Sequence, residues 1–128
     1  MFDQALDHVS ITVADFEAVR PFYEEVLGLK QDPSRPAFGF PGAWYQLGNS
    51  QIHLIEEPEG VDLGTRAPKL VPMAPHLAIR VADYDAAVEH FKARDIEVFE
   101  TNADNGQLWV RDPAGNIIEL TLRHRASP

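Results

Sequence analysis

The chain has 128 residues, which is enough for one small domain or for two halves that share a core. Its formal net charge of −9, from 20 acidic and 11 basic residues, disfavours binding to nucleic-acid phosphates. The absence of cysteine excludes disulfides, thiol nucleophiles and cysteine-ligated zinc or iron–sulfur sites. Apolar runs fall far short of the roughly 18 residues that cross a bilayer, so we expect no membrane partner.

The first ten residues indicate where in the cell the protein is expected. They include Asp3, Asp7 and His8 and have no basic region ahead of an apolar one, so they do not resemble a signal peptide. We therefore expect a cytoplasmic protein.

The first regular elements begin at His8. Residues 8–13 alternate between polar and apolar side chains, which predicts a strand with one face on the core. Asp15 is placed to cap a helix over residues 16–27, where apolar residues recur at helical spacing, and Gly28 suits the turn that ends it. Pro21 conflicts with a regular helix, so we expect a kink there or a helix that begins only one residue before it.

Shorter strands and two long connections complete the first half. Strands are predicted at residues 29–32, 44–47 and 51–55. Proline and glycine are frequent from Asp32 to Gly42, which predicts a loop, and again from Glu56 to Pro75, which predicts a linker.

The chain then repeats itself. Residues 8–16 recur as residues 76–84, with histidine, isoleucine, Val-Ala-Asp and an aromatic residue in register. Asp83 matches Asp15 as a helix cap, and the second helix is expected to end near Ala93. Further strands are predicted at residues 97–100, 107–111 and 116–122.

The order β-α-β-β-β therefore occurs twice. We expect an α+β fold in which paired βαβββ modules form an open, curled, mixed β-sheet around a cavity. The predicted organisation is one domain over residues 1–128, with a first module at 1–56, a linker at 57–75, a second module at 76–122 and a tail at 123–128.

Four strands each carry one ligand-type residue on the face opposite the aliphatic row. These residues are His8, His53, His76 and Glu119, and they occupy corresponding first and last strands of the two halves. A single strand histidine is more often a hydrogen-bonded structural residue than a ligand. Because four such residues coincide in register, we predict one divalent metal ion, with Zn, Ni, Mn, Co and Fe(II) all compatible with imidazole and carboxylate donors.

The motifs around these residues resemble the vicinal oxygen chelate superfamily, which includes glyoxalase I, extradiol dioxygenases, methylmalonyl-CoA epimerase and the fosfomycin- and bleomycin-resistance proteins. The resemblance covers nearly the whole chain, and one fold in this group hosts many chemistries. It rests on Leu-Asp-His-Val at residues 6–9, Val-Ala-Asp at 13–15, Phe-Tyr-Glu-Glu-Val-Leu-Gly-Leu at 22–29, Pro-His-Leu-Ala at 75–78 and Arg-Asp-Pro-Ala-Gly-Asn-Ile-Ile-Glu-Leu at 111–120.

The resemblance implies a paired βαβββ fold that encloses a metal ion. His8, His76 and Glu119 match the most widely shared ligand positions, and His53 matches the fourth. At that fourth position glyoxalase I-like enzymes usually have Glu and epimerase-like enzymes Gln, so His53 is a departure at a residue that helps to move a proton.

Three functions remain open at this point. The first is a metal-dependent lyase or isomerase, which would act on vicinal oxygens through a metal-stabilised enediolate with Glu119 or His53 as the catalytic proton carrier. The second is an Fe(II) extradiol-type dioxygenase for a catechol-like aromatic, with His8, His76 and Glu119 as its triad. The third is a bleomycin-resistance-like protein that binds an aromatic or cationic small molecule without catalysis. The net charge of −9 favours cations, and the residues expected to stack on a ring are Trp44, Tyr45, Trp109, Phe38 and Phe40.

Contacts to a small-molecule substrate follow from the same alternation. Residues expected on the ligand-bearing face or on the cavity wall are Trp44, Trp109, Arg111 and Arg123. An arginine there would hold a substrate carboxylate, although a surface ion pair is the commoner role for each arginine taken alone. By analogy with the superfamily we also expect a homodimer.

Overall fold

The computed structural model describes residues 1–122. The chain divides into two compact units, one from Met1 to Thr65 and one from Arg66 onward. Arg123, predicted as a substrate contact, lies outside the described residues, as does the expected tail. None of the described helices is both long enough and apolar enough to span a membrane.

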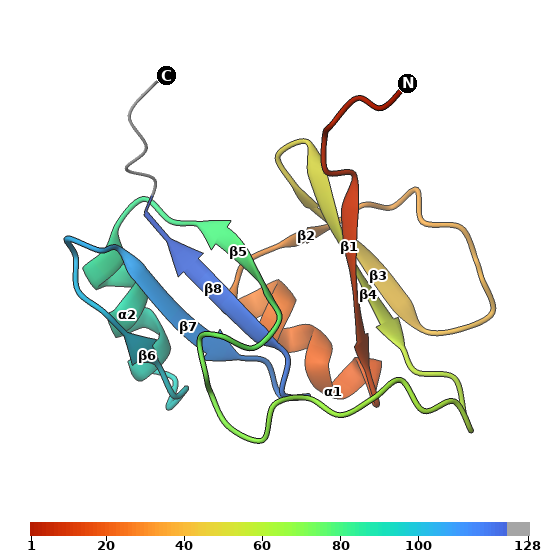
Figure 1. Cartoon of the computed structure of the whole chain (residues 1–128). Helices are drawn as coiled ribbons and strands as arrows, with labels where there is room; N and C mark the ends of the chain where they lie inside the picture. The colour runs from red at the N-terminus through yellow and green to blue at the C-terminus, as the bar shows by residue number, and fades with distance from the viewer. Residues whose placement is uncertain (123–128) are drawn as a thin grey trace. The chain divides into compact units, whose positions relative to one another are not determined.

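The first unit is a four-stranded mixed sheet with one helical segment (Figure 1). The strand order is β1-β4-β3-β2, and only the β1–β4 pair is parallel. Its elements are β1 (His8–Val13), α1 (Phe16–Pro21), the π-helix η1 (Phe22–Val26), β2 (Lys30–Gln31), β3 (Gly42–Leu47) and β4 (Ser50–Glu56).

The second unit repeats this plan. Its strand order is β5-β8-β7-β6, with β5 and β8 parallel and the other pairs antiparallel. Its elements are β5 (His76–Arg80), α2 (Tyr84–Lys92), β6 (Phe99–Glu100), β7 (Gln107–Arg111) and β8 (Ile117–Thr121). The predicted order β-α-β-β-β is thus confirmed in both halves, and so is the α+β class with open mixed sheets.

The strand registers show how closely the two units correspond. His53 of β4 pairs with Ser10 of β1 and with Trp44 of β3. Glu119 of β8 pairs with Ala78 of β5 and with Trp109 of β7. Each unit therefore places a ligand-type residue beside a tryptophan at the same point of its sheet.

Both helices begin at the aspartates that the sequence predicts as caps. The Asp15 carboxylate accepts a hydrogen bond from the backbone N–H of Ala18 at 3.2 Å, and the Asp83 carboxylate accepts one from Ala86 at 3.0 Å. The first helical segment ends before Gly28, whose φ of +69° lies in the left-handed region that glycine adopts without steric cost.

Pro21 divides the first helical segment. The α-helix begins at Phe16, so the alternative of a helix that begins beside Pro21 is wrong. The segment changes from α-helix to π-helix directly after the proline. Pro21 has no backbone N–H to donate, and the next regular bond, from Leu27 N to Phe22 O at 2.9 Å, spans five residues instead of four. The expected irregularity is therefore a π-helical turn over Phe22–Val26.

Most of the buried apolar side chains come from the strands and helices of the two units. In the first unit the buried rings of Tyr23 and Tyr45 stack at 5.9 Å. In the second unit part of the expected linker also joins the core, because Leu70 is buried against Trp109 and Ile117. The fully buried aliphatic side chains are Val13, Leu54, Leu108, Val110 and Ile118.

Candidate functional site

Three flat rings stack on the polar face of the first sheet. The imidazoles of His8 and His53 lie 3.9 Å apart between ring centroids, at an interplanar angle of 13°. The indole of Trp44 stacks on the other side of His53, at 4.4 Å and 8°. The strand register explains the contact with Trp44, because this residue is the cross-strand neighbour of His53.

Hydrogen bonds orient both imidazoles. Nδ1 of His8 lies 2.6 Å from the Asp7 carboxylate, which can only accept, so Nδ1 carries the proton and Nε2 has the lone pair. Nε2 of His53 lies 2.8 Å from Oε1 of Gln51. The Gln51 amide donates through Nε2 to Asp32 and to Gln46, which turns its Oε1 toward His53 and leaves the lone pair of His53 on Nδ1.

Electrostatics keep His53 neutral near pH 7. Its partial burial and the neighbouring His8 together hold the pKa of His53 below its usual range, because both disfavour a charged imidazolium. A neutral imidazole has a free lone pair, which is the form that binds a metal ion or accepts a proton.

These rings line an open pocket of about 580 Å³ in the first unit. Its wall is polar, with three carboxamides and one carboxylate among the side chains around the two imidazoles and the indole. The lining residues are Asp7, His8, Trp44, Gln46, Asn49, Gln51 and His53.

The second unit carries a histidine–carboxylate pair. Nε2 of His76 lies 3.0 Å from Oε1 of Glu119, and Nδ1 of His76 lies 2.7 Å from the carbonyl oxygen of Ala74. Glu119 is buried, and its other oxygen accepts a hydrogen bond from Gln107 at 3.3 Å. His76 is therefore held between two oxygen acceptors, the Ala74 carbonyl at Nδ1 and the Glu119 carboxylate at Nε2.

Two residues of the second unit that the sequence predicts as substrate contacts, Trp109 and Arg111, make contacts within their own unit. Trp109 is buried beneath Leu70 and meets His76 edge to face at 6.4 Å, and its indole N–H has no hydrogen-bond partner. Arg111 lies 3.6 Å from the Glu97 carboxylate and donates to the carbonyl oxygen of Pro68. A role in substrate binding stays a prediction for both residues.

Each unit thus brings together its own pair of predicted ligands, His8 with His53 and His76 with Glu119. Within residues 1–122 there is no group of three or more His, Asp or Glu side chains placed to hold a metal ion. The four-ligand site therefore stays a prediction.

Sequence reasoning missed the residues that orient the two imidazoles of the first unit. Asp7 precedes His8 directly, and Gln51 lies two residues before His53 on the same strand face, so both positions were visible in the pattern. Arg35 was also missed, because it lies in a loop rich in proline and glycine where alternation makes no prediction.

Comparison with known proteins agrees with this architecture. A protein of Bacillus anthracis described as glyoxalase family is 27% identical, covers 96% of this chain and 98% of its own, and superposes with a TM-score of 0.75. The antibiotic binding protein TnmS3 of Streptomyces shares the fold, with a TM-score of 0.70 at 22% identity over 95% of this chain and 98% of that one.

Among curated sequences, the mitochondrial methylmalonyl-CoA epimerase of Bos taurus is 29% identical over 127 residues, which span 90% of this chain and 72% of the bovine one. Paired βαβββ units with ligand-type residues on matching strands define the class of protein. The Glyoxalase/Bleomycin resistance protein/Dioxygenase superfamily matches residues 5–120, and the chain belongs to this superfamily.

Proposed function

We propose that the chain is a divalent-metal-dependent, glyoxalase-like lyase or isomerase, which acts on a small substrate with vicinal oxygens. One divalent ion would be held by His8, His53, His76 and Glu119. The observation that carries the proposal is the His76–Glu119 pair, in which an imidazole nitrogen and a buried carboxylate oxygen face each other at 3.0 Å. Two such donors suit a shared cation.

The hydrogen bonds behind the ligands support the same proposal. Metal-binding histidines usually donate their second ring N–H to a carboxylate or a carbonyl, which fixes the ring and directs the lone pair at the metal. Asp7 does this for His8, and the carbonyl of Ala74 does it for His76. The donor set of three imidazoles and one carboxylate fits Zn, Ni, Mn, Co and Fe(II).

A bound divalent ion would draw electron density from two adjacent substrate oxygens and so acidify the neighbouring C–H bond. The chain supplies the group that moves this proton. His53 would be the fourth donor at rest. Once released from the ion, its Nδ1 lone pair would be free to take the proton, and the lowered pKa of His53 keeps this nitrogen unprotonated at neutral pH. Glu119 holds its place through Gln107 and His76.

The named activity of a relative is compatible with this chemistry. The bovine protein is an epimerase, and epimerisation at a carbon beside a carbonyl removes and returns one proton. In this chain an imidazole stands where the epimerase-like proteins carry an amide, so we assign the proton transfer to His53 itself.

Metal analysis tests the proposal. The untagged protein is purified, its metals are quantified by elemental mass spectrometry, and the measurement is repeated for Glu119→Ala and for Glu89→Ala, an exposed carboxylate of α2. We expect about one divalent ion per site in the wild type and in Glu89→Ala, and loss of the ion in Glu119→Ala. A protein that contains no metal and takes none up on titration would contradict the proposal.

The second candidate is the Fe(II) extradiol-type dioxygenase. It is favoured by the flat rings beside the ligands, because Trp44 stacks on His53 and would also stack on a catechol ring. The metal distinguishes the two candidates, since bound Fe(II) would favour the dioxygenase and bound Zn, Ni, Mn or Co the lyase or isomerase.

A further inference from the structure

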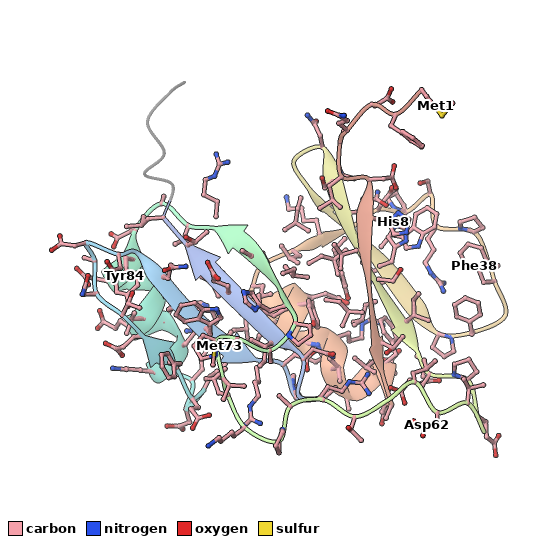
Figure 2. All side chains as sticks on the ribbon, viewed as in Figure 1. Met1, His8, Phe38, Asp62, Met73 and Tyr84 are labelled. Carbon is pink, nitrogen blue, oxygen red and sulfur yellow. The ribbon has the colours of Figure 1, made fainter. Side chains whose placement is uncertain are left out.

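A row of aromatic rings leads away from the pocket of the first unit. From Trp44, which lines the pocket, the row continues to Phe38 at 6.1 Å and from Phe38 to Phe40 at 5.5 Å. Phe38 and Phe40 belong to the loop between β2 and β3, and Figure 2 shows ring side chains between the labelled Phe38 on this loop and the labelled His8 on β1.

An arginine completes this row. The guanidinium of Arg35 lies 5.1 Å from the ring centroid of Phe38 and 5.4 Å from that of Phe40, and its Nη2 donates to the carbonyl oxygen of Phe40 at 3.1 Å. Gly42 leaves room for it, because a Cβ at that position would lie 2.9 Å from Nη2. We call Arg35, Phe38, Phe40 and Trp44 the aryl–arginine cluster.

The charge of Arg35 is not neutralised within its unit. Among residues 1–122 no carboxylate lies within ion-pair distance of its guanidinium, whereas Arg20 of the same unit is paired with Glu17 and Glu24. Four of the five N–H groups of a guanidinium remain after the bond to Phe40, and they match a carboxylate or a phosphate in geometry.

The rings of the cluster are also incompletely covered. Phe38 is 47% exposed and Phe40 is 42% exposed, although side chains of this kind usually contribute to a core. Exposed aromatic faces that adjoin a pocket are suited to stacking on a flat ligand.

We propose that the aryl–arginine cluster binds the planar ring and the anionic group of the substrate. The ring lies against the exposed faces of Phe38 and Phe40, and Arg35 holds the anion, while the reacting end of the molecule reaches the pocket past Trp44. This inference rests on the proposed function for the identity of the reacting site. Two sources of this ligand chemistry exist, an aryl carboxylate and an adenine nucleotide.

Binding to the metal-free protein tests the inference. Protein dialysed against EDTA is titrated calorimetrically with phenylpyruvate, with pyruvate, which lacks the ring, and with phenylacetone, which lacks the carboxylate. A second set of titrations tests the nucleotide with AMP and with adenosine, which lacks the phosphate. We expect phenylpyruvate to bind about tenfold more tightly than pyruvate and phenylacetone, or AMP to exceed adenosine by the same factor. The stronger of the two arms identifies the source.

Matched variants locate the site. Arg35→Gln and the double variant Phe38→Leu/Phe40→Leu should each weaken binding about tenfold. Lys30→Gln removes an exposed charge from β2 of the same unit, and Phe2→Leu removes a ring that is 82% exposed, so both should leave the affinity unchanged. Circular dichroism of each variant verifies folding.

Three results would overturn the inference. The first is equal binding of the complete probes and their truncated analogues, and the second is an Arg35→Gln variant with wild-type affinity. The third is a wild-type dimer in sedimentation together with a monomeric Phe38→Leu/Phe40→Leu variant that retains wild-type affinity for the probes. A second copy of the chain would then be what covers the two rings. Metal uptake measured on the same preparations tests the proposed function separately.

Discussion

Glu24 shows how single residues tie the first helical segment to the sheet. Its carboxylate accepts hydrogen bonds from the hydroxyl of Tyr45 at 2.7 Å and from Nε of Arg20 at 2.9 Å. Burial works to raise the pKa of Glu24, but these bonds and one from Gln31 outweigh it and hold the pKa below its usual range. Burial and the Glu24 carboxylate raise the pKa of Tyr45, so its hydroxyl stays protonated and donates.

Glu24→Gln should therefore lower the free energy of unfolding at pH 7 by about 1–2 kcal/mol, because the charged hydrogen bonds from Arg20 and Tyr45 are lost or weakened. A carboxyl group with a lowered pKa stabilises the fold above its unfolded-state pKa, near 4.3, and loses this effect as the pH falls through its folded-state pKa. Urea unfolding of both proteins at pH 7 and pH 3 should show the difference shrinking at acid pH.

The neighbouring Glu25→Gln is the control, since Glu25 is exposed, and it should change stability little at either pH. A Glu24→Gln effect of the same size at both pH values would mean that packing, and not the charge, is what the carboxylate contributes.

At the same residue scale, the candidate ligands were predictable from the sequence, but the contacts that orient their side chains were not. Alternation in a strand assigns His8 and His53 to one face, and this needs only the sequence. The parallel stacking of the two imidazoles depends on the pairing of β1 with β4, where residues 43 positions apart are register partners. No local pattern contains that pairing.

At the scale of elements, the helix caps are the clearest link between sequence and structure. In each unit an aspartate joins the first strand to the helix. The two residues have nearly equal backbone angles, with φ and ψ of −136° and 104° at Asp15 and −137° and 110° at Asp83. This extended backbone before the first turn is the conformation of an N-cap residue. The two caps also differ, because Glu56 accepts an additional bond from the N–H of Phe16.

Asp83→Ala should lower the free energy of unfolding by about 1 kcal/mol, since the N–H of Ala86 loses its acceptor. Asp83→Asn is the matched variant, because an amide oxygen caps a helix about as well as a carboxylate, and it should retain most of the stability. Thermal and urea unfolding of the three proteins measure the effect. Equal destabilisation by both substitutions would show that the carboxylate charge matters and not the capping bond.

The π-helical turn η1 is the element that the sequence describes least well. Apolar spacing from Phe16 to Leu27 predicts one continuous helix, and Pro21 indicates only that the helix is irregular near this residue. The change is a wider, π-helical turn that directly follows Pro21, and Phe22 and Tyr23 at its start are both buried.

At the scale of the whole molecule, metal binding is coupled to stability. A ligand that binds only the folded protein stabilises it by about 2.7 kcal/mol at a concentration one hundredfold above its Kd. We expect Zn²⁺ or Mn²⁺ to raise the melting temperature of the EDTA-treated wild type measurably, and to leave that of His76→Ala or Glu119→Ala nearly unchanged. Differential scanning calorimetry provides the measurement.

His90→Ala is the control for this experiment, because His90 lies on α2 and is not among the proposed ligands. Its melting temperature should respond to metal as the wild type does. A shift of equal size in Glu119→Ala would place the binding elsewhere in the chain.

The sequence by itself determined the two βαβββ units, the faces of their strands, the helix caps and the candidate ligands, because alternation, helical spacing and capping are local and the internal repeat reinforces each of them. Tertiary structure alone decided the stacking of His8, His53 and Trp44, the burial of Trp109 beneath Leu70 and the position of Arg35 over two rings. These contacts join residues distant in sequence or held in an irregular loop, where only packing selects the side chains that meet.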